Sequence, residues 1–170
     1  MDLLEEMRAA LGALYTDDFA RVVRFVMYNG AALHDAQDAA NEAFAEASKS
    51  IADGSWHRVG NPGGWIRRVA LRRWRRPPRS RNSVLAYPVA ELPEPVTDVP
   101  PHEVADSTLD VLAALARLAP TPRAVIAFAM DGYSVAETAE ALRIGYGEVT
   151  DLRAKAKKSL RKYLADEGRA

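Results

Sequence analysis

DGYSVAETAEALRIGYGEVTDLRAKAKKSLRKYL, residues 131–164, carries the clearest structural pattern of the sequence. Ser134 can cap a helix while Glu137, three residues later, reaches back to it, an arrangement known as a capping box. The pattern breaks around Gly145 and Gly147, and apolar residues then resume at helical spacing. Two helices joined by a short turn, the second rich in lysine and arginine, predict a helix-turn-helix of the kind that binds nucleic acid. An ordinary helical hairpin with a solvated basic face is the alternative from these residues alone.

The formal net charge of zero conceals a segregation of charge along the chain. Residues 1–53 carry ten acids and four bases, whereas residues 54–82 carry nine arginines and no acid. Residues 83–107 carry five acids and no base, and residues 108–170 carry eight acids and ten bases. Such blocks predict separate roles: an acidic face, a basic surface for a polyanion, an acidic tether and a mildly basic end.

Length and composition limit the classes of protein to which the chain can belong. With 170 residues it can hold one medium domain or two small ones. The absence of cysteine excludes a disulfide scaffold and a thiolate zinc site, and we expect a cytoplasmic protein. No apolar run approaches the roughly 18 residues of a membrane span, and the first residues lack the positive region of a signal peptide. We therefore expect no membrane insertion.

The spacing of apolar residues predicts an all-α fold made of two small helical bundles. In the first bundle, helices are expected at about 2–14, 17–30, 35–51 and 61–76. The third of these carries an alanine-rich stripe, which favours close packing. Asn61 and Pro62 supply an N-cap and a first-turn proline for the fourth. In the second bundle, helices that start near Ser107 and Pro120 are expected to pack under the helix-turn-helix.

Residues 77–107 separate the two bundles. They contain seven prolines and several acids without helical periodicity, which predicts a flexible acidic linker. As a random coil this linker would span on the order of 30 Å. The expected organisation is therefore a first domain at 1–76, the linker at 77–107, and a helix-turn-helix domain at 108–170.

Carboxylates recur every four residues along the helix expected at 35–51, at Asp38, Glu42 and Glu46. Like charges at this spacing destabilise an isolated helix by roughly 0.2–0.5 kcal/mol per pair, so we expect something basic to face them. A metal site is a less favoured alternative, because no E-x-x-H partner is present and the three histidines are scattered. A plain solvated face is the other alternative.

The loop at 53–61 and the helix after it combine arginines with aromatic side chains. Guanidinium groups suit the phosphates of single-stranded DNA, and indole rings suit its unstacked bases. We expect Trp65 to face the core and Trp56, in a glycine-flanked loop, to be exposed and functional. The alternative is that Trp65 and Trp74 are simply core residues. The residues expected to contact a strand are Trp56, His57, Arg58, Asn61, Arg67, Arg68, Arg72, Arg75 and Arg76.

Four motifs occur in an order that resembles the extracytoplasmic-function (ECF) sigma factors of bacterial RNA polymerase. The first is D-A-x-D-x-x-x-E-x-F at 35–44, and the second is N-P-x-x-W-I at 61–66, followed by the arginines and the acidic linker. The third is L-x-P-x-x-R-x-V at 118–125, and the fourth is G-Y-S-V-A-E-T-A-E-A-L at 132–142. No single motif is specific, but the four together cover nearly the whole chain.

The resemblance implies a promoter-specificity subunit that is not an enzyme and has no catalytic residue, metal or cofactor. The arginine and tryptophan residues named above would melt the minus-ten element of promoter DNA and hold its unpaired strand. The expected partners are core RNA polymerase, through the clamp helices of its largest subunit and the flap of its second-largest subunit, promoter DNA, and an anti-sigma protein. The clamp helices would be bound by the acidic residues Asp35, Asp38, Glu42 and Glu46.

The helix-turn-helix would read the minus-thirty-five element in the major groove. Its expected contacts are Ser134, Tyr146, Glu148, Thr150, Asp151, Arg153, Lys155, Lys157 and Lys158.

The sequence departs from the family pattern at three places. Arg143 stands where the family's turn usually has a left-handed glycine, at a cost of about 1 kcal/mol unless Gly145 takes over that role. Glu148 and Asp151 bring acids to a recognition helix that tends to be neutral or basic, and Arg72 stands where the family often has Asn. A sigma-derived regulator that binds DNA or polymerase without initiating is therefore the alternative function. A pure protein–protein module would leave the arginine block unexplained.

Overall fold

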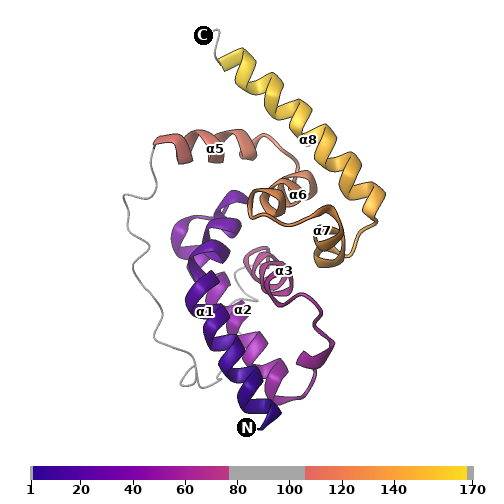
Figure 1. Ribbon diagram of the computed structural model, residues 1–170. Coiled ribbons are helices and arrows are strands. Elements are labelled where there is room, and N and C mark those ends of the chain that lie inside the picture. Colours follow the sequence, from indigo (N-terminus) through magenta and orange to yellow (C-terminus); the bar gives the residue numbers. More distant parts are fainter. Residues whose placement is uncertain (1, 77–105, 168–170) are drawn as a thin grey trace.

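The computed structural model describes residues 2–76 and 106–167, which form seven α-helices and a short 3-10 turn, with no strand among them. The all-α prediction is thereby confirmed. In Figure 1, α1 and α2 run side by side, α3 lies against them, and α5 to α8 sit over one end of this group. The elements are α1 (Leu3–Tyr28), α2 (Leu33–Ala52), η1 (Trp56–Arg58), α3 (Pro62–Trp74), α5 (Asp106–Ala116), α6 (Pro120–Met130), α7 (Val135–Leu142) and α8 (Tyr146–Glu167). We call α1 to α3 the N-terminal half and α5 to α8 the C-terminal half.

A single helix, α1, replaces the two helices predicted on either side of Asp17. Neither Gly12 nor Asp17 removes a backbone hydrogen bond, so packing of the apolar residues before and after them overrides their low helix propensity. The helix ends as predicted, because Gly30 has a φ of +110°, in the left-handed region that favours glycine.

The small-residue stripe of α2 is the centre of the N-terminal half. Its members pack between α1 and α3, and the ring of Phe44 lies 5.0 Å from that of Tyr15 and 6.2 Å from that of Phe19, centroid to centroid. The stripe is buried as predicted from its spacing. Its residues are Ala36, Ala39, Ala40, Ala43, Phe44 and Ala47.

Two of the helix starts predicted from capping residues are confirmed, those at Asn61 and Ser134. The Oδ1 atom of Asn61 accepts a hydrogen bond from the backbone N–H of Gly64 at 2.9 Å, directly before α3. Before α7, the Ser134 hydroxyl accepts from the N–H of Glu137 at 3.2 Å, and the Glu137 carboxylate accepts from the N–H of Ser134 at 2.8 Å. These short-range bonds orient α3 and the helix-turn-helix, formed by α7 and α8.

The larger hydrophobic core extends across both halves, and we call this packing of the halves the closed arrangement. A second, smaller cluster lies within the C-terminal half, at Leu115, Leu118, Ile126 and Ala156. Phe128 of α6 is fully buried, and its ring centroid lies 4.7 Å from that of Phe25 in α1 and 5.2 Å from that of Tyr133. The domain boundaries at 76 and 107 remain a prediction. The predicted linker lies outside the described residues, except that 106 and 107 already belong to α5.

Candidate nucleic-acid interface

Arg67 of α3, predicted to face a DNA strand, is fully buried between the halves. Its Nε donates to Oδ2 of Asp131 at 2.6 Å, and its terminal nitrogens donate to the Asp18 carboxylate at 2.6 and 2.9 Å. One terminal nitrogen also donates to the Tyr133 hydroxyl at 2.9 Å. The outward prediction for Arg67 is wrong, because its acidic partners lie 49 and 64 residues away and form no local pattern.

These four residues, the Arg67 cluster, join the two halves electrostatically. Burial alone lowers the pKa of Arg67, but the hydrogen bond to Asp18 and the charges of Asp131 and Asp18 raise that pKa above its ordinary value. The guanidinium therefore stays charged and is balanced by two carboxylates. Because Asp131 and Tyr133 belong to the C-terminal half, the cluster fixes that half against α1 and α3.

Two further arginines cross the contact between the halves. Arg21 of α1 donates to the backbone carbonyl of Asp131 at 2.9 Å. Arg123, the arginine of the L-x-P-x-x-R motif, donates to the carbonyl of Asn29 at 3.0 Å, where α1 ends. A side chain at Gly30 would place its Cβ only 2.9 Å from the terminal nitrogen of Arg123, so it would push aside the end of that side chain, and the positive φ itself favours glycine. The motif arginine thus has a structural role in the closed arrangement.

The tryptophans of the predicted strand-binding surface are exposed in the opposite order to that expected. Trp56 is only 9% exposed and packs edge-on against Trp65, with ring centroids 5.3 Å apart. Trp65 is partly exposed and lines a cavity between the halves. The expected exposure of Trp56 is wrong, because η1 folds the loop back and tucks its indole under α3. Of these two, Trp65 is the indole that a ligand can reach.

The acidic row of α2 faces α3 of the same chain at one end. The Glu46 carboxylate accepts hydrogen bonds from both Arg72 and Arg73, and a terminal nitrogen of Arg73 lies 2.6 Å from it. Glu42 lies 3.6 Å from Arg73. The basic partner that the like-charge spacing predicted is therefore present within the chain. Asp38, further along the row, remains exposed.

Replacing Glu46 by glutamine is expected to flatten the loss of stability in acid. Burial alone raises the pKa of Glu46, but hydrogen bonds from Arg72 and Arg73 lower it below its ordinary 4.5. Because the pKa of Glu46 is lower in the folded state, its ionised carboxylate stabilises the folded protein above the ordinary pKa of 4.5. This contribution is lost as the pH falls through the folded-state pKa of Glu46. In urea denaturation, we expect the free energy of unfolding of wild type to exceed that of Glu46→Gln by about 0.5–1 kcal/mol at pH 7. At low pH the two free energies should be equal. Asp166→Asn, at an exposed position on α8, is the control; a constant offset for Glu46→Gln at every pH would contradict this assignment.

The remaining members of the predicted strand-binding set differ in accessibility. His57 and Arg58 are exposed in η1, and Asn61 and Arg68 are partly exposed beside them. Arg75 donates to the carbonyl of Pro120 in the other half at 3.4 Å, and Arg76 is partly buried. In the closed arrangement, the structure therefore leaves only part of this set open to a strand.

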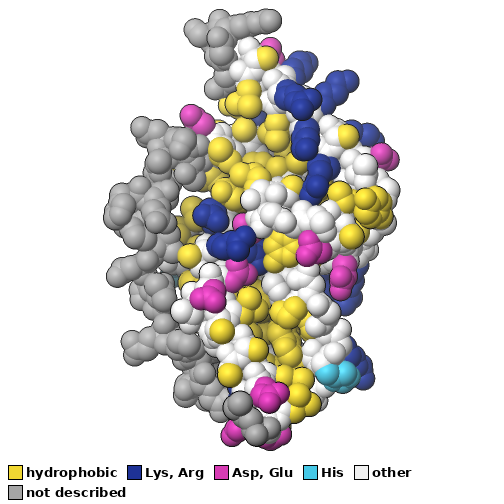
Figure 2. Space-filling view, viewed as in Figure 1, with side chains coloured by type: hydrophobic (Ala, Val, Ile, Leu, Met, Phe, Trp, Pro, Cys, Tyr) yellow, Lys and Arg dark blue, Asp and Glu magenta, His cyan; other side chains and the backbone are white. Residues whose placement is uncertain are grey.

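The basic residues of α8 lie mainly on the face away from the core. Val149 and Ala156 are buried on its inner side. Lys158 follows Val149 by nine residues, about two and a half helical turns, which places it on the opposite side. Figure 2 shows lysine and arginine side chains along α8. Exposed members of the predicted minus-thirty-five set are Ser134, Tyr146, Glu148, Thr150, Asp151, Lys155, Lys157 and Lys158.

Arg153 differs from the rest of this set. It is partly buried, and its terminal nitrogen donates to the carbonyl of Tyr133 at 3.1 Å, so it holds α8 to the turn between α6 and α7. Arg153 and Lys157 also border a groove of about 540 Å³ between α5, α6 and α8. The groove is otherwise lined mostly by apolar side chains such as Leu115 and Ile126. Figure 2 shows a hydrophobic area beside α8.

The turn of the helix-turn-helix is built on Arg143. Its backbone has φ 57° and ψ 43°, the left-handed conformation expected at this position. Gly145 does not have a positive φ, so it has not taken over the role of the missing glycine. Sequence reasoning missed Asp18, Asp131 and Tyr133, whose importance depends on contacts with Arg67 far along the chain.

Comparisons with known proteins identify the fold. No family model and no curated protein sequence matches the chain. The solved structure of CnrH in complex with the cytosolic domain of CnrY aligns with it at a TM-score of 0.68 and 18% identity, over 96% of each chain. CnrH is an ECF sigma factor, so the chain has an ECF-sigma-like fold. The 1.8 Å structure of the RsbN–BldN complex aligns at 23% identity over 95% of this chain and 99% of that chain, but with a TM-score of only 0.33.

Two other features are absent from residues 2–76 and 106–167. None of the helices there combines the length and the apolar character needed to cross a membrane. Nor do three or more histidine, aspartate or glutamate side chains gather there in a way that could hold a metal ion.

Proposed function

We propose that this protein is a sigma factor that directs core RNA polymerase to specific promoters and assists their melting. The observation that carries the proposal is the helix-turn-helix whose outer face is basic, on a chain that shares the CnrH fold from end to end. A helix of this kind suits the major groove, with lysines such as Lys155 and Lys158 neutralising phosphates. Bond-forming chemistry would remain with the polymerase.

The closed arrangement implies that the halves separate before both promoter elements are read. Arg67 and Arg75 contact the C-terminal half, and Trp65 faces it across a cavity. Separation would make Arg75 and Trp65 accessible to an unpaired strand. Arg67 would keep its ion pair with Asp18, which belongs to the same half. The stronger candidates for the minus-ten surface are therefore Trp65, Arg58, Arg68 and Arg75. Trp56 and Arg67 are weaker candidates because both are buried.

Polymerase contacts are proposed at two separate surfaces of the molecule. The exposed carboxylate of Asp38, with Asp35 one turn before it, is free of the arginines of α3 that engage Glu46, so it is the stronger candidate for the clamp helices. The apolar groove between α5, α6 and α8 would receive an amphipathic segment of the flap. Since CnrH was solved with the cytosolic domain of CnrY, an anti-sigma protein is a proposed partner as well.

Substituting Lys158 by alanine is expected to weaken duplex DNA binding and lower its salt dependence. Loss of one phosphate contact should reduce the slope of log affinity against log salt by about 0.9. Fluorescence anisotropy between 50 and 200 mM NaCl measures this slope, with Lys49→Ala on α2 as the matched control. An unchanged slope for Lys158→Ala would show that the outer face of α8 does not meet DNA.

Transcription in vitro tests the proposal directly. Purified core polymerase is incubated with sheared genomic DNA from the source organism, with and without the chain, and the transcript 5′ ends are sequenced. We expect new 5′ ends that depend on the chain and share sequence elements about 10 and 35 base pairs upstream, a spacing of roughly two and a half helical turns. Identical 5′ ends in both reactions would refute initiation.

A regulator that binds polymerase or DNA without initiating is the second candidate. It is favoured by Glu148 and Asp151, which are exposed on α8 where carboxylates repel phosphates. This function predicts co-purification with core polymerase or DNA in the absence of any chain-dependent 5′ end.

A further inference from the structure

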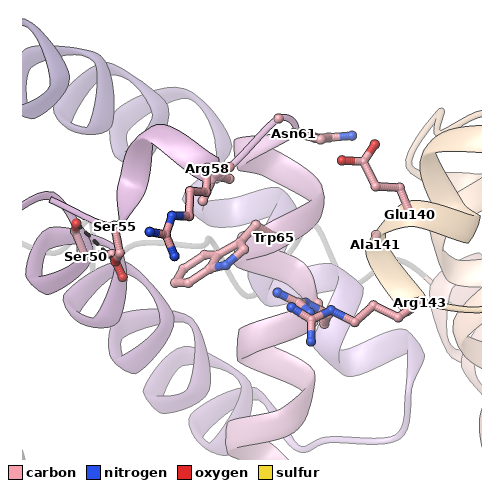
Figure 3. Close-up of a pocket in the computed structure, with 11 residues that line it drawn as sticks. Ser50, Ser55, Arg58, Asn61, Trp65, Glu140, Ala141 and Arg143 are labelled. Carbon is pink, nitrogen blue, oxygen red and sulfur yellow. Dashed lines mark hydrogen bonds between the residues drawn. The ribbon is translucent and has the colours of Figure 1, made fainter.

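A cavity of about 340 Å³ lies between η1 and the start of α3 on one side and α7 on the other (Figure 3). Three arginines from three different elements line it: Arg58, Arg68 and Arg143. No carboxylate among the described residues forms an ion pair with any of them, in contrast to Arg67 and Arg73 nearby. The cavity therefore gathers three positive charges against one lining carboxylate, Glu140.

Two of these arginines oppose each other across the contact between the halves. Burial lowers the pKa of Arg68, and the positive charges of Arg143 and Arg72 lower it further, against a smaller opposite effect of Glu46. In Figure 3, Arg143 extends from the α7 side toward α3. Like charges held together in this way are unfavourable unless an anion comes between them.

The backbone of Arg143 is strained as well. Within the described residues it is the one non-glycine with a positive φ, a conformation that glycine adopts at little cost and arginine does not. Strain of this kind concentrates at ligand sites, where the side chain has a use that glycine cannot supply. The guanidinium of Arg143 is thus a candidate ligand-binding group.

The lining indicates what the ligand is. Guanidinium groups match the geometry of phosphate, and the partly exposed ring of Trp65 offers a flat surface to an aromatic base. Asn61 adds an amide, and the one lining carboxylate, Glu140, points toward Asn61 in Figure 3. The volume lies near the lower limit of small-molecule sites, about 300–1,000 Å³, and suits one nucleotide better than a strand.

We propose that this cavity binds a single nucleotide, with its phosphate between Arg58, Arg68 and Arg143 and its base against Trp65. Because α3 and α7 form opposite walls, only the closed arrangement has the complete site. Bound nucleotide therefore favours that arrangement over separated halves. This inference does not depend on promoter-directed initiation.

Isothermal titration of the full chain with ADP, pyrophosphate and adenosine tests the site. We expect ADP to bind at least tenfold more tightly than either fragment, since it alone reaches both the arginines and Trp65. Arg68→Ala should weaken ADP binding at least tenfold. Arg161→Ala, on an exposed position of α8, should leave it unchanged and is the matched control for net charge.

Arg143→Gly separates loss of the ligand from loss of the fold. Glycine accepts the left-handed backbone, so the melting temperature without ligand should not fall, while ADP affinity should drop at least tenfold. ADP should raise the melting temperature of wild type but not of Arg143→Gly.

Four results would overturn the proposal. Absence of ADP binding would show that the cavity is not a nucleotide site. Equal loss of ADP affinity in Arg161→Ala and Arg68→Ala would show that ADP is held only by nonspecific electrostatic attraction. Equal affinity for ADP and pyrophosphate would show that the base does not bind against Trp65. Tighter binding of oligo-dT than of ADP, insensitive to Arg143→Gly, would assign these arginines to a DNA strand instead.

Discussion

Replacing Arg67 by methionine is expected to destabilise the protein by about 3–5 kcal/mol, among the largest losses that a single side chain can cause here. Methionine fills similar space, but it leaves Asp18 and Asp131, both under 10% exposed, without their main cationic partner. Urea denaturation followed by circular dichroism measures the loss.

Removing the two unpaired carboxylate charges, those of Asp18 and Asp131, should restore most of the lost stability. The matched control is the triple variant Arg67→Met, Asp18→Asn, Asp131→Asn, which keeps the shape of the cluster without its charges. If Arg67→Met alone costs less than about 1 kcal/mol, the range of an exposed ion pair, the buried cluster does not exist in solution.

Truncating Phe128 to alanine is expected to separate the two halves. Phe128 is fully buried and its ring meets Phe25 of the other half, so the substitution should cost about 3–5 kcal/mol, much of it from contacts between the halves. Small-angle X-ray scattering should report a radius of gyration clearly above the roughly 15 Å of a compact chain of this length.

Phe44→Ala provides the matched comparison for Phe128→Ala. Phe44 is equally buried, but its aromatic partners Tyr15 and Phe19 belong to the same half. It should lose similar stability without an increase in radius below its melting temperature. An equal increase in both variants would mean general unfolding, and no increase in Phe128→Ala would show that this contact does not hold the halves together.

Features encoded by neighbouring residues could be predicted from the sequence. The capping box at Ser134, the Asn61 cap and the alanine stripe of α2 depend on spacings of three or four residues, and the structure has each of them. The left-handed turn at Arg143 was expected from the family resemblance alone, with Gly145 as the alternative position, and the structure places it at Arg143. A single continuous α1 was missed, because packing along its whole length outweighed the helix-start signal at Asp17.

Features that depend on distant partners could not be predicted. An arginine-rich helix indicates a basic surface, yet Arg67 is buried by carboxylates 49 and 64 residues away. The same limit reversed the expected exposure of Trp56 and Trp65, which depends on how η1 folds back. Charge pattern alone does not show which cations the chain neutralises itself.

A reversible lock on the closed arrangement tests most directly whether this chain directs transcription by opening. Because the sequence has no cysteine, Gly60→Cys and Glu140→Cys introduce a unique thiol pair, at positions where a side chain on Gly60 would lie 3.3 Å from the Glu140 carboxylate. The pair is joined by a short, cleavable thiol cross-linker, and chain-dependent transcription from genomic DNA is measured before joining, after joining and after cleavage. We expect promoter-dependent transcripts before joining and after cleavage, and none while the halves are joined. Equal transcription in the joined state would contradict the need for opening, and no chain-dependent transcript in any state would contradict the proposed function itself.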